Sequence, residues 1–176
     1  MIMENSSAST EWFDVVDEND CVIGKETRQE VHRKKLLHRA IHVFVFRADG
    51  SLYLQKRSAT KDTAPNKWVS SCSGHVDSGE VYEDSALREL GEELGIQATP
   101  NDLQEIMAVP AVPETGYEFV RLYRIENFEG TVVPDPEEVA GGTWKKPEEI
   151  DEWIRRAPRD FSLSFLYLWE LYGKHR

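Results

Sequence analysis

The most informative group of residues whose types and spacing could do chemistry lies in residues 74 to 96, GHVDSGEVYEDSALRELGEELGI. The segment contains no proline, and its apolar residues recur at intervals of three and four, which predicts a helix from about Val81 to Leu94. On such a helix Glu89, Glu92 and Glu93 would project from a single face. Crowded carboxylates repel one another, and a ligand set made of oxygen suits Mg²⁺ or Mn²⁺. The spacing therefore favours a divalent-cation site over a solvated acidic face.

A loop with two glycines, residues 73 to 79, precedes the predicted helix. Glycine lets the backbone approach a cation or a phosphate closely, so Gly74 is a candidate to bring a backbone ligand to the same metal. Cations held by carboxylates promote attack of water on a diphosphate, because they neutralise oxygen charge and lower the pKa of a bound water. Loop and helix together predict one hydrolytic site.

Position for position, this segment resembles the signature of the Nudix hydrolases. That pattern combines two glycines, an arginine, four glutamates and two apolar positions, filled here by Gly74, Glu80, Arg88, Glu89, Leu90, Glu92, Glu93, Gly95 and Ile96. The resemblance implies hydrolysis of a nucleoside diphosphate linked to some group X, with Mg²⁺, or alternatively Mn²⁺, as the cofactor. It also implies an α+β fold, the αβα sandwich with a mixed central sheet that the family shares.

The resemblance also implies roles for individual residues. The positions that correspond to the family's metal site are Glu89, Glu92, Glu93 and Gly74. Arg88 and Glu80 match positions that support the loop and the helix. One glutamate often serves as the general base, and our hypothesis is Glu93. The candidate catalytic residues are Glu93, Glu92, Arg88 and Glu118, although Glu118 is equally well explained as an ordinary strand residue.

A second stretch, residues 52 to 80, resembles isopentenyl diphosphate isomerase, an enzyme with the same fold. The matching positions are Arg57, Lys61, Trp68 and His75. In that enzyme the arginine and lysine contact diphosphate and the histidine binds a metal. The resemblance makes Arg57 and Lys61 candidate substrate-binding residues and His75 a candidate ligand, whereas Trp68 is better explained as a core residue.

Departures from the isomerase pattern favour hydrolysis. Ser73 stands where the isomerase has its cysteine, and Cys72 comes one residue earlier, where it is expected to be a small buried side chain. Gly116 replaces the first of two glutamates, of which Glu118 is the second. Isomerisation of isopentenyl diphosphate therefore remains the alternative, together with a non-catalytic nucleotide-binding module.

Other candidates rank lower. Three histidines, His32, His38 and His42, are expected to be structural or exposed, because their spacing completes no metal site. Glu137 and Glu138 are second-rank candidates for the general base.

Composition limits the partners. The 176 residues carry a formal charge of −11, which argues against polymeric nucleic acid or an anionic membrane as the main partner and leaves a small diphosphate substrate. The N-terminal sequence does not resemble a signal peptide and no apolar run is long enough for a transmembrane helix, so a cytoplasmic location is expected. Two cysteines suggest reduced thiols. A homodimer is left open.

The order of elements predicts one domain. We expect a loose tail at residues 1–10, an N-terminal hairpin and connection at 11–35, the Nudix domain at 36–170 and a C-terminal end at 171–176. Residues 12–17 and 22–25 should form the hairpin, and residues 40–46 and 52–55 a central hairpin. Further strands are expected at 105–112, 119–125 and 142–144, and helices at 147–155 and 162–172.

Overall fold

The computed structural model describes residues 10 to 175. The predicted tail therefore lies almost entirely outside the described residues. The helices are α1 (Arg28–Lys34), α2 (Tyr82–Leu94), α3 (Pro147–Arg156) and α4 (Leu163–Gly173). The strands are β1 (Trp12–Val16), β2 (Val22–Thr27), β3 (His38–Val45), β4 (Leu52–Arg57), β5 (Trp68–Val69), β6 (Cys72–His75), β7 (Gln104–Val109), β8 (Glu118–Ile125) and β9 (Val139–Lys145).

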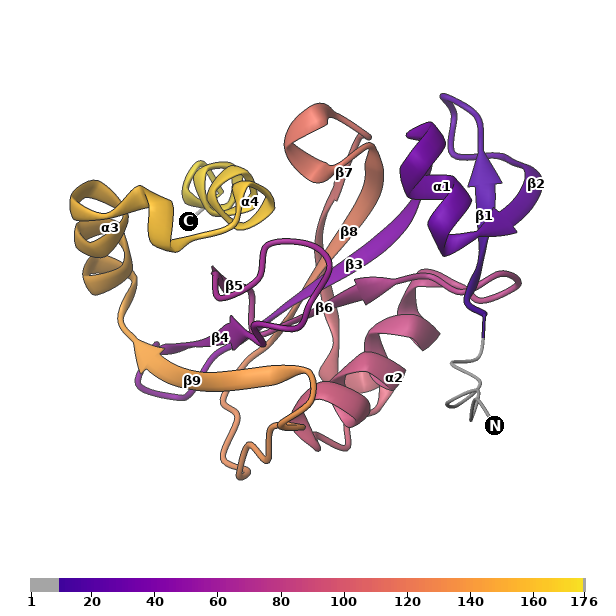
Figure 1. Cartoon of the computed structure of the whole chain (residues 1–176). Helices are drawn as coiled ribbons and strands as arrows, with labels where there is room; N and C mark the ends of the chain where they lie inside the picture. The colour runs from indigo at the N-terminus through magenta and orange to yellow at the C-terminus, as the bar shows by residue number, and fades with distance from the viewer. Residues whose placement is uncertain (1–9, 176) are drawn as a thin grey trace, which may run out of the picture.

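A mixed four-stranded sheet lies at the centre, with strand order β6-β3-β8-β7 (Figure 1). Strands β3 and β8 are parallel and in full register, from the pair His38 and Glu118 to the pair Val45 and Ile125. Strand β6 joins β3 on its other edge in the antiparallel sense, with His75 opposite Ala40. These pairings bring the start of β3, the start of β8 and the end of β6 to the same end of the sheet.

A second sheet has the order β5-β4-β9 and is antiparallel. The expected central hairpin of β3 with β4 is therefore wrong, because the two strands are joined only by one bridge, between Phe46 and Leu52. Both edges of β3 are already paired, by β6 and β8, so β4 cannot hydrogen-bond along it. The N-terminal hairpin of β1 and β2 is confirmed.

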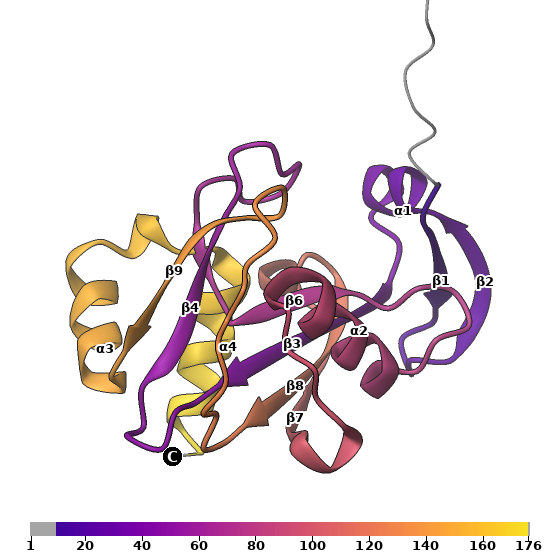
Figure 2. The same ribbon diagram turned by 90° about the horizontal axis from the view of Figure 1, so that it is seen from below.

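Helices cover the two sides of the sheets, which confirms the αβα sandwich (Figures 1 and 2). Helix α2 packs on one side through Ala86, Leu90 and Leu94, in a core shared with Ile41 and Val43 of β3. Helices α3 and α4 pack on the other side, in a core shared with β3, β4 and β8 whose helical members are Ile150, Phe165, Leu168, Trp169 and Tyr172. The continuous apolar run of β3 follows from this, because a strand covered on both faces has no solvent side.

The predicted helices agree with α2, α3 and α4 to within a residue or two at either end. Helix α1 and the short strands β5 and β6 had no counterpart in the expectations. Helix α1 has only seven residues, too few for a clear helical period, and it is fixed by its ends: Thr27 accepts a hydrogen bond from Glu30 N, and Lys35 takes a left-handed conformation. No helix within residues 10 to 175 is long and apolar enough to cross a membrane.

Candidate active site

Helix α2 and the preceding loop are tied together by Arg88. Its guanidinium donates two hydrogen bonds of 3.0 Å to the carboxylate of Glu80 and one of 3.2 Å to the carbonyl oxygen of His75. The same group contacts Glu89 at 2.9 Å and Glu92 at 3.2 Å. Although burial opposes the charge, the carboxylates of Glu80 and Glu89 raise the pKa of Arg88. The guanidinium of Arg88 thus holds the loop in place and positions Glu89 and Glu92 on α2.

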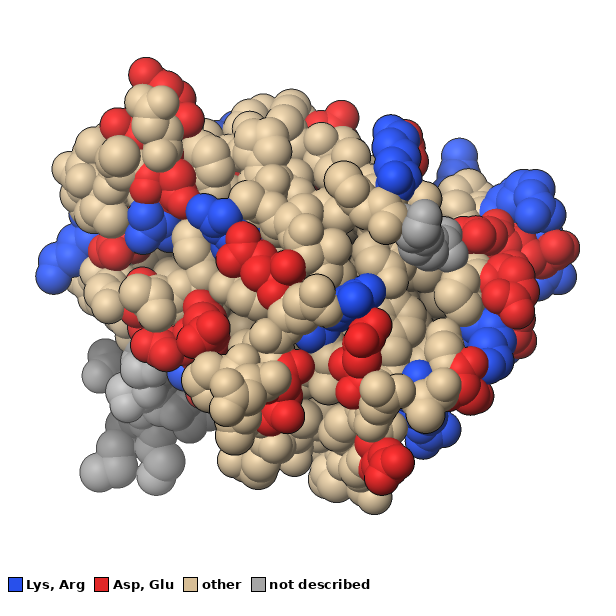
Figure 3. All heavy atoms as spheres, turned by 180° about the vertical axis from the view of Figure 1, so that it is seen from behind, with Lys and Arg blue, Asp and Glu red and all other residues tan. Residues whose placement is uncertain are grey.

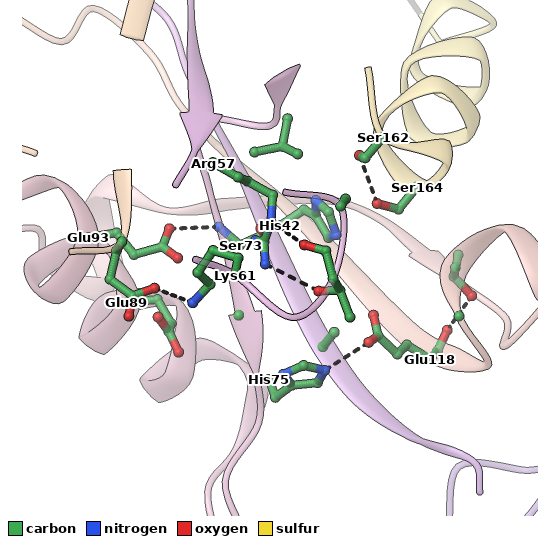
Figure 4. A pocket seen from close by; sticks show the side chains of 18 of the residues that line it. His42, Arg57, Lys61, Ser73, His75, Glu89, Glu93, Glu118, Ser162 and Ser164 are labelled. Carbon is green, nitrogen blue, oxygen red and sulfur yellow. Dashed lines mark hydrogen bonds and ion pairs between the residues drawn. The ribbon is translucent and has the colours of Figure 1, made fainter. Parts of the chain in front are cut away.

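The carboxylates of Glu89 and Glu93 point from α2 into a pocket of about 680 Å³ (Figure 4). Burial, together with repulsion from Glu93, raises the pKa of Glu89 to about 8. Burial also raises the pKa of Glu93, whose side chain is only 5% exposed. Glu92 lines the same pocket from a more exposed position. Acidic groups whose ionisation is opposed in this way fit a bound cation, because a cation would remove the repulsion.

Gly74 is in contact with the Glu89 side chain. A Cβ atom at Gly74 would lie 2.3 Å from Cδ and Oε1 of Glu89, far inside van der Waals contact. The absence of a side chain is therefore what allows Glu89 to lie against β6 and face the pocket. This is a steric reason for a glycine at the first position of the motif, in addition to any backbone ligand it supplies.

Three histidines and a glutamate form a second group at the same end of the sheet. The four residues are His32, His38, His75 and Glu118, and their ligand atoms all lie within 4.8 Å of one another. His75 Nε2 is 2.9 Å from Glu118 Oε1, and His38 Nε2 is 3.4 Å from the same oxygen. His32 Nε2 lies 3.4 Å from His75 Nε2. Three imidazole nitrogens and one carboxylate oxygen this close together could serve as ligands of a common ion.

The protonation of this group suits a cation as well. His38 Nδ1 is 2.8 Å from the Leu36 carbonyl oxygen and must donate to it, so in the neutral ring Nε2 carries the lone pair. That Nε2 is the one buried side-chain polar atom in the described part of the chain that lacks a hydrogen-bond partner. Burial, reinforced by the neighbouring imidazoles of His75 and His38, lowers the pKa of His32 to about 4, which keeps this ring neutral near pH 7. Burial opposes ionisation of Glu118, but His75 holds its pKa well below the usual range.

The structure brings His32 and His38 together with His75 and Glu118, a grouping that was not expected from the sequence. The sequence spacing gave no signal, because α1 and the parallel pairing of β3 with β8 bring these residues to His75 and Glu118. His42 does lie apart from the cluster: it is buried, with Nδ1 2.8 Å from Ser70 Oγ, and burial lowers its pKa to about 4.

Basic side chains line the pocket beside the carboxylates. Arg57 donates to the carbonyl oxygen of Thr63 at 2.9 Å, and Lys61 forms an ion pair with Glu138. Arg28, which the sequence did not single out, also lines the pocket and forms ion pairs with Glu11 at 2.8 Å and Asp62 at 3.0 Å. A guanidinium or ammonium group in this position could bind phosphate oxygens. On the face seen in Figure 3, by contrast, acidic and basic side chains are interspersed and form no extended basic surface.

Cys72 and Ser73 lie on opposite faces of β6. Ser73 lines the pocket, whereas Cys72 is fully buried in the core beneath α2. Burial, with the charges of Glu93 and Glu89, raises the pKa of the Cys72 thiol well above its ordinary value. A thiol held protonated beneath the helix is poorly suited to reaction with a substrate in the pocket.

Comparison with known proteins agrees with this architecture. Residues 36–165 match the family described as NUDIX domain. An uncharacterised Nudix hydrolase of Yersinia pestis is 35% identical over 169 residues, which cover 96% of this chain and 91% of that protein. An isopentenyl-diphosphate Delta-isomerase of Serratia proteamaculans is 33% identical over 154 residues, which cover 86% of each protein. A crystal structure from Deinococcus radiodurans superimposes with a TM-score of 0.75 at 26% identity, over 93% of this chain and 98% of that one.

The fold, the complete motif on α2 and these similarities define the class of protein. The chain belongs to the Nudix family. Membership supports action on pyrophosphates and use of a divalent metal in general terms.

Proposed function

We propose that this protein hydrolyses a phosphoric anhydride bond in a nucleoside diphosphate derivative or a related organic diphosphate, by attack of water on phosphorus. The observation that carries the proposal is the meeting of buried carboxylates and basic side chains in one pocket. Glu89 and Glu93 enter from α2, and Arg57 and Lys61 come from β4 and the loop that follows it. A pocket with this composition matches a diphosphate and the divalent cation that accompanies it.

The residues of the chain would divide the work as follows. Glu89, Glu92 and Glu93 hold Mg²⁺ or Mn²⁺, which when bound neutralises phosphate charge and favours ionisation of water. Arg57 and Lys61 bind the diphosphate oxygens and orient the reacting bond. Glu93 accepts the proton of the attacking water, because burial raises its pKa and so makes it a stronger base.

The cluster of His32, His38, His75 and Glu118 fits a second divalent ion. Its ligand atoms lie close together, and the buried Nε2 of His38 makes no hydrogen bond to the described residues. Three imidazoles and one carboxylate suit Zn²⁺, Mn²⁺, Fe²⁺ or Co²⁺ better than Mg²⁺, which prefers oxygen ligands. An ion there would add positive charge to the same substrate pocket.

The same cluster favours a second candidate function, isomerisation of isopentenyl diphosphate. A relative named for that activity is similar over most of its length. Two features argue against this function here: Cys72 is buried away from the pocket, and Ser73 presents a hydroxyl in place of a thiol. A serine hydroxyl is a much weaker acid than a thiol and a poor substitute in proton transfer to carbon. Hydrolysis is therefore the preferred function.

A substrate screen tests the proposal directly. Phosphate and pyrophosphate release would be followed by ³¹P NMR with Mg²⁺ or Mn²⁺, using nucleoside di- and triphosphates, nucleotide sugars, dinucleotides and isopentenyl diphosphate. Glu93→Gln should abolish release, whereas Cys72→Ala should retain it. Conversion of isopentenyl diphosphate to its isomer, lost in Cys72→Ala and kept in Glu93→Gln, would replace hydrolysis with isomerisation. Binding of substrates without turnover in any metal would indicate a sensing module.

A further inference from the structure

Gln55 lies in β4 and is almost completely buried, although its side chain is an amide. The strand reads Leu52, Tyr53, Leu54, Gln55, and the exposed fraction of Gln55 is 1%. Side chains alternate along a strand, and the two leucines belong to the core beneath α3 and α4, whereas Tyr53 belongs to the core beneath α2. Gln55 therefore points to the α2 side of the sheet, where Glu93 lies.

The amide of Gln55 meets the carboxylate of Glu93. Gln55 Nε2 donates to Glu93 Oε2 at 3.0 Å, and the backbone N–H of Ser73 donates to the same oxygen at 3.2 Å. Two donors from two different strands, β4 and β6, thus converge on Oε2 and fix the rotation of the carboxylate. The other oxygen, Oε1, is the one that can face the pocket.

Burial gives this contact its weight. An amide buried without a hydrogen bond is costly, and a carboxylate buried without donors is more so, so each group offsets the penalty of the other. Gln55 and Glu93 are only 1% and 5% exposed, so their side chains have little room to adopt other rotamers. The contact therefore restricts Glu93 to one orientation before any ligand arrives.

We propose that Gln55 is a positioning residue: by donating to Oε2 of Glu93, it aims Oε1 at the cation and the water in the pocket. The inference rests on the proposed role of Glu93 as a metal ligand and base. It assigns to β4 a part in the site beyond the motif on α2, and it explains why a polar side chain is buried in this strand next to Leu54.

Mn²⁺ binding to the full-length protein, followed by the EPR signal of free Mn²⁺, tests this without any substrate. The Mn²⁺ held by the α2 carboxylates is defined as the bound fraction that Glu93→Gln removes. Gln55→Met keeps the volume and removes the donor, while Gln55→Asn keeps the amide but shortens its reach. Leu54→Met, a volume-conserving change on the opposite face of β4, controls for disturbance of the strand.

Both Gln55 variants should weaken this Mn²⁺ binding by about 10- to 100-fold, the usual effect of removing an outer-sphere partner, and Leu54→Met should not. The EPR spectrum of the bound ion should also change in the Gln55 variants. If Gln55→Met does not fold, Gln55→Asn decides the question alone. Wild-type affinity in a folded Gln55 variant, while Glu93→Gln abolishes binding, would overturn the positioning role and leave the proposed function intact. Undiminished Mn²⁺ binding in Glu93→Gln would overturn both.

Discussion

Replacing Gly74 by alanine should damage the metal site far more than the fold. The added Cβ would lie 2.3 Å from Cδ and Oε1 of Glu89 and 2.7 Å from its Cγ, so one of the two must move. The clashing atoms are at the end of a flexible side chain, and the cheapest response is rotation of Glu89 away from β6. A side chain forced off its preferred rotamer costs about 0.5–1.5 kcal/mol. For a domain of this size that is a fall in Tm of about 1–6 °C.

Displacement of the carboxylate has a larger effect on binding. Loss of a correctly oriented contact at a metal site typically reduces affinity or activity by about 10- to 100-fold. We therefore expect Gly74→Ala to remain folded by calorimetry, with Mn²⁺ affinity and turnover reduced to this extent. Gly24→Ala is the matched control, because a Cβ there meets nothing within 4 Å. Equal Mn²⁺ affinity and turnover in the two variants would refute the steric account of Gly74.

Three further predictions concern the charges of the pocket. Glu138→Gln should free Lys61 to bind phosphate and lower KM by up to about fivefold, which corresponds to the strength of a part-exposed ion pair. Glu137→Gln should leave KM unchanged. An unchanged KM in Glu138→Gln would show that Lys61 does not bind the substrate. The pKa of Glu89 is raised from 4.5 to about 8, so the metal-free protein should lose stability as pH rises through that range. The increase in Tm caused by Mg²⁺ should therefore grow with pH. An increase in Tm that is independent of pH would contradict this prediction. Co²⁺ should give a visible absorption band that His32→Ala removes, and retention of the band would exclude His32 as a ligand.

The sequence was most informative where the site is local. The motif places its glutamates on one helix, so spacing alone predicted that Glu89 and Glu93 share a face, and the structure brings both to one pocket. The histidine cluster could not be predicted in this way. His38 and Glu118 are neighbours because β3 and β8 run parallel in full register, and nothing in either strand's own sequence fixes that partner. The role proposed for Gln55 was missed for the same reason, because its contact with Glu93 depends on how β4 and α2 are placed in the fold.

The pleat of β6 links these observations to the choice between hydrolysis and isomerisation. Successive residues of a strand face opposite sides, so a shift of one position moves a side chain from a pocket to a core. Here the shift puts the thiol of Cys72 beneath α2, beside Glu93, and the hydroxyl of Ser73 in the pocket. The same backbone gives Ser73 N as a donor to Glu93. Strand β6 thus places the Cys72 thiol, which proton transfer to carbon would need, outside the pocket. The same strand orients the Glu93 carboxylate, which hydrolysis would use. The two chemistries compete for the same few residues, and in this chain the arrangement favours water attack on phosphorus.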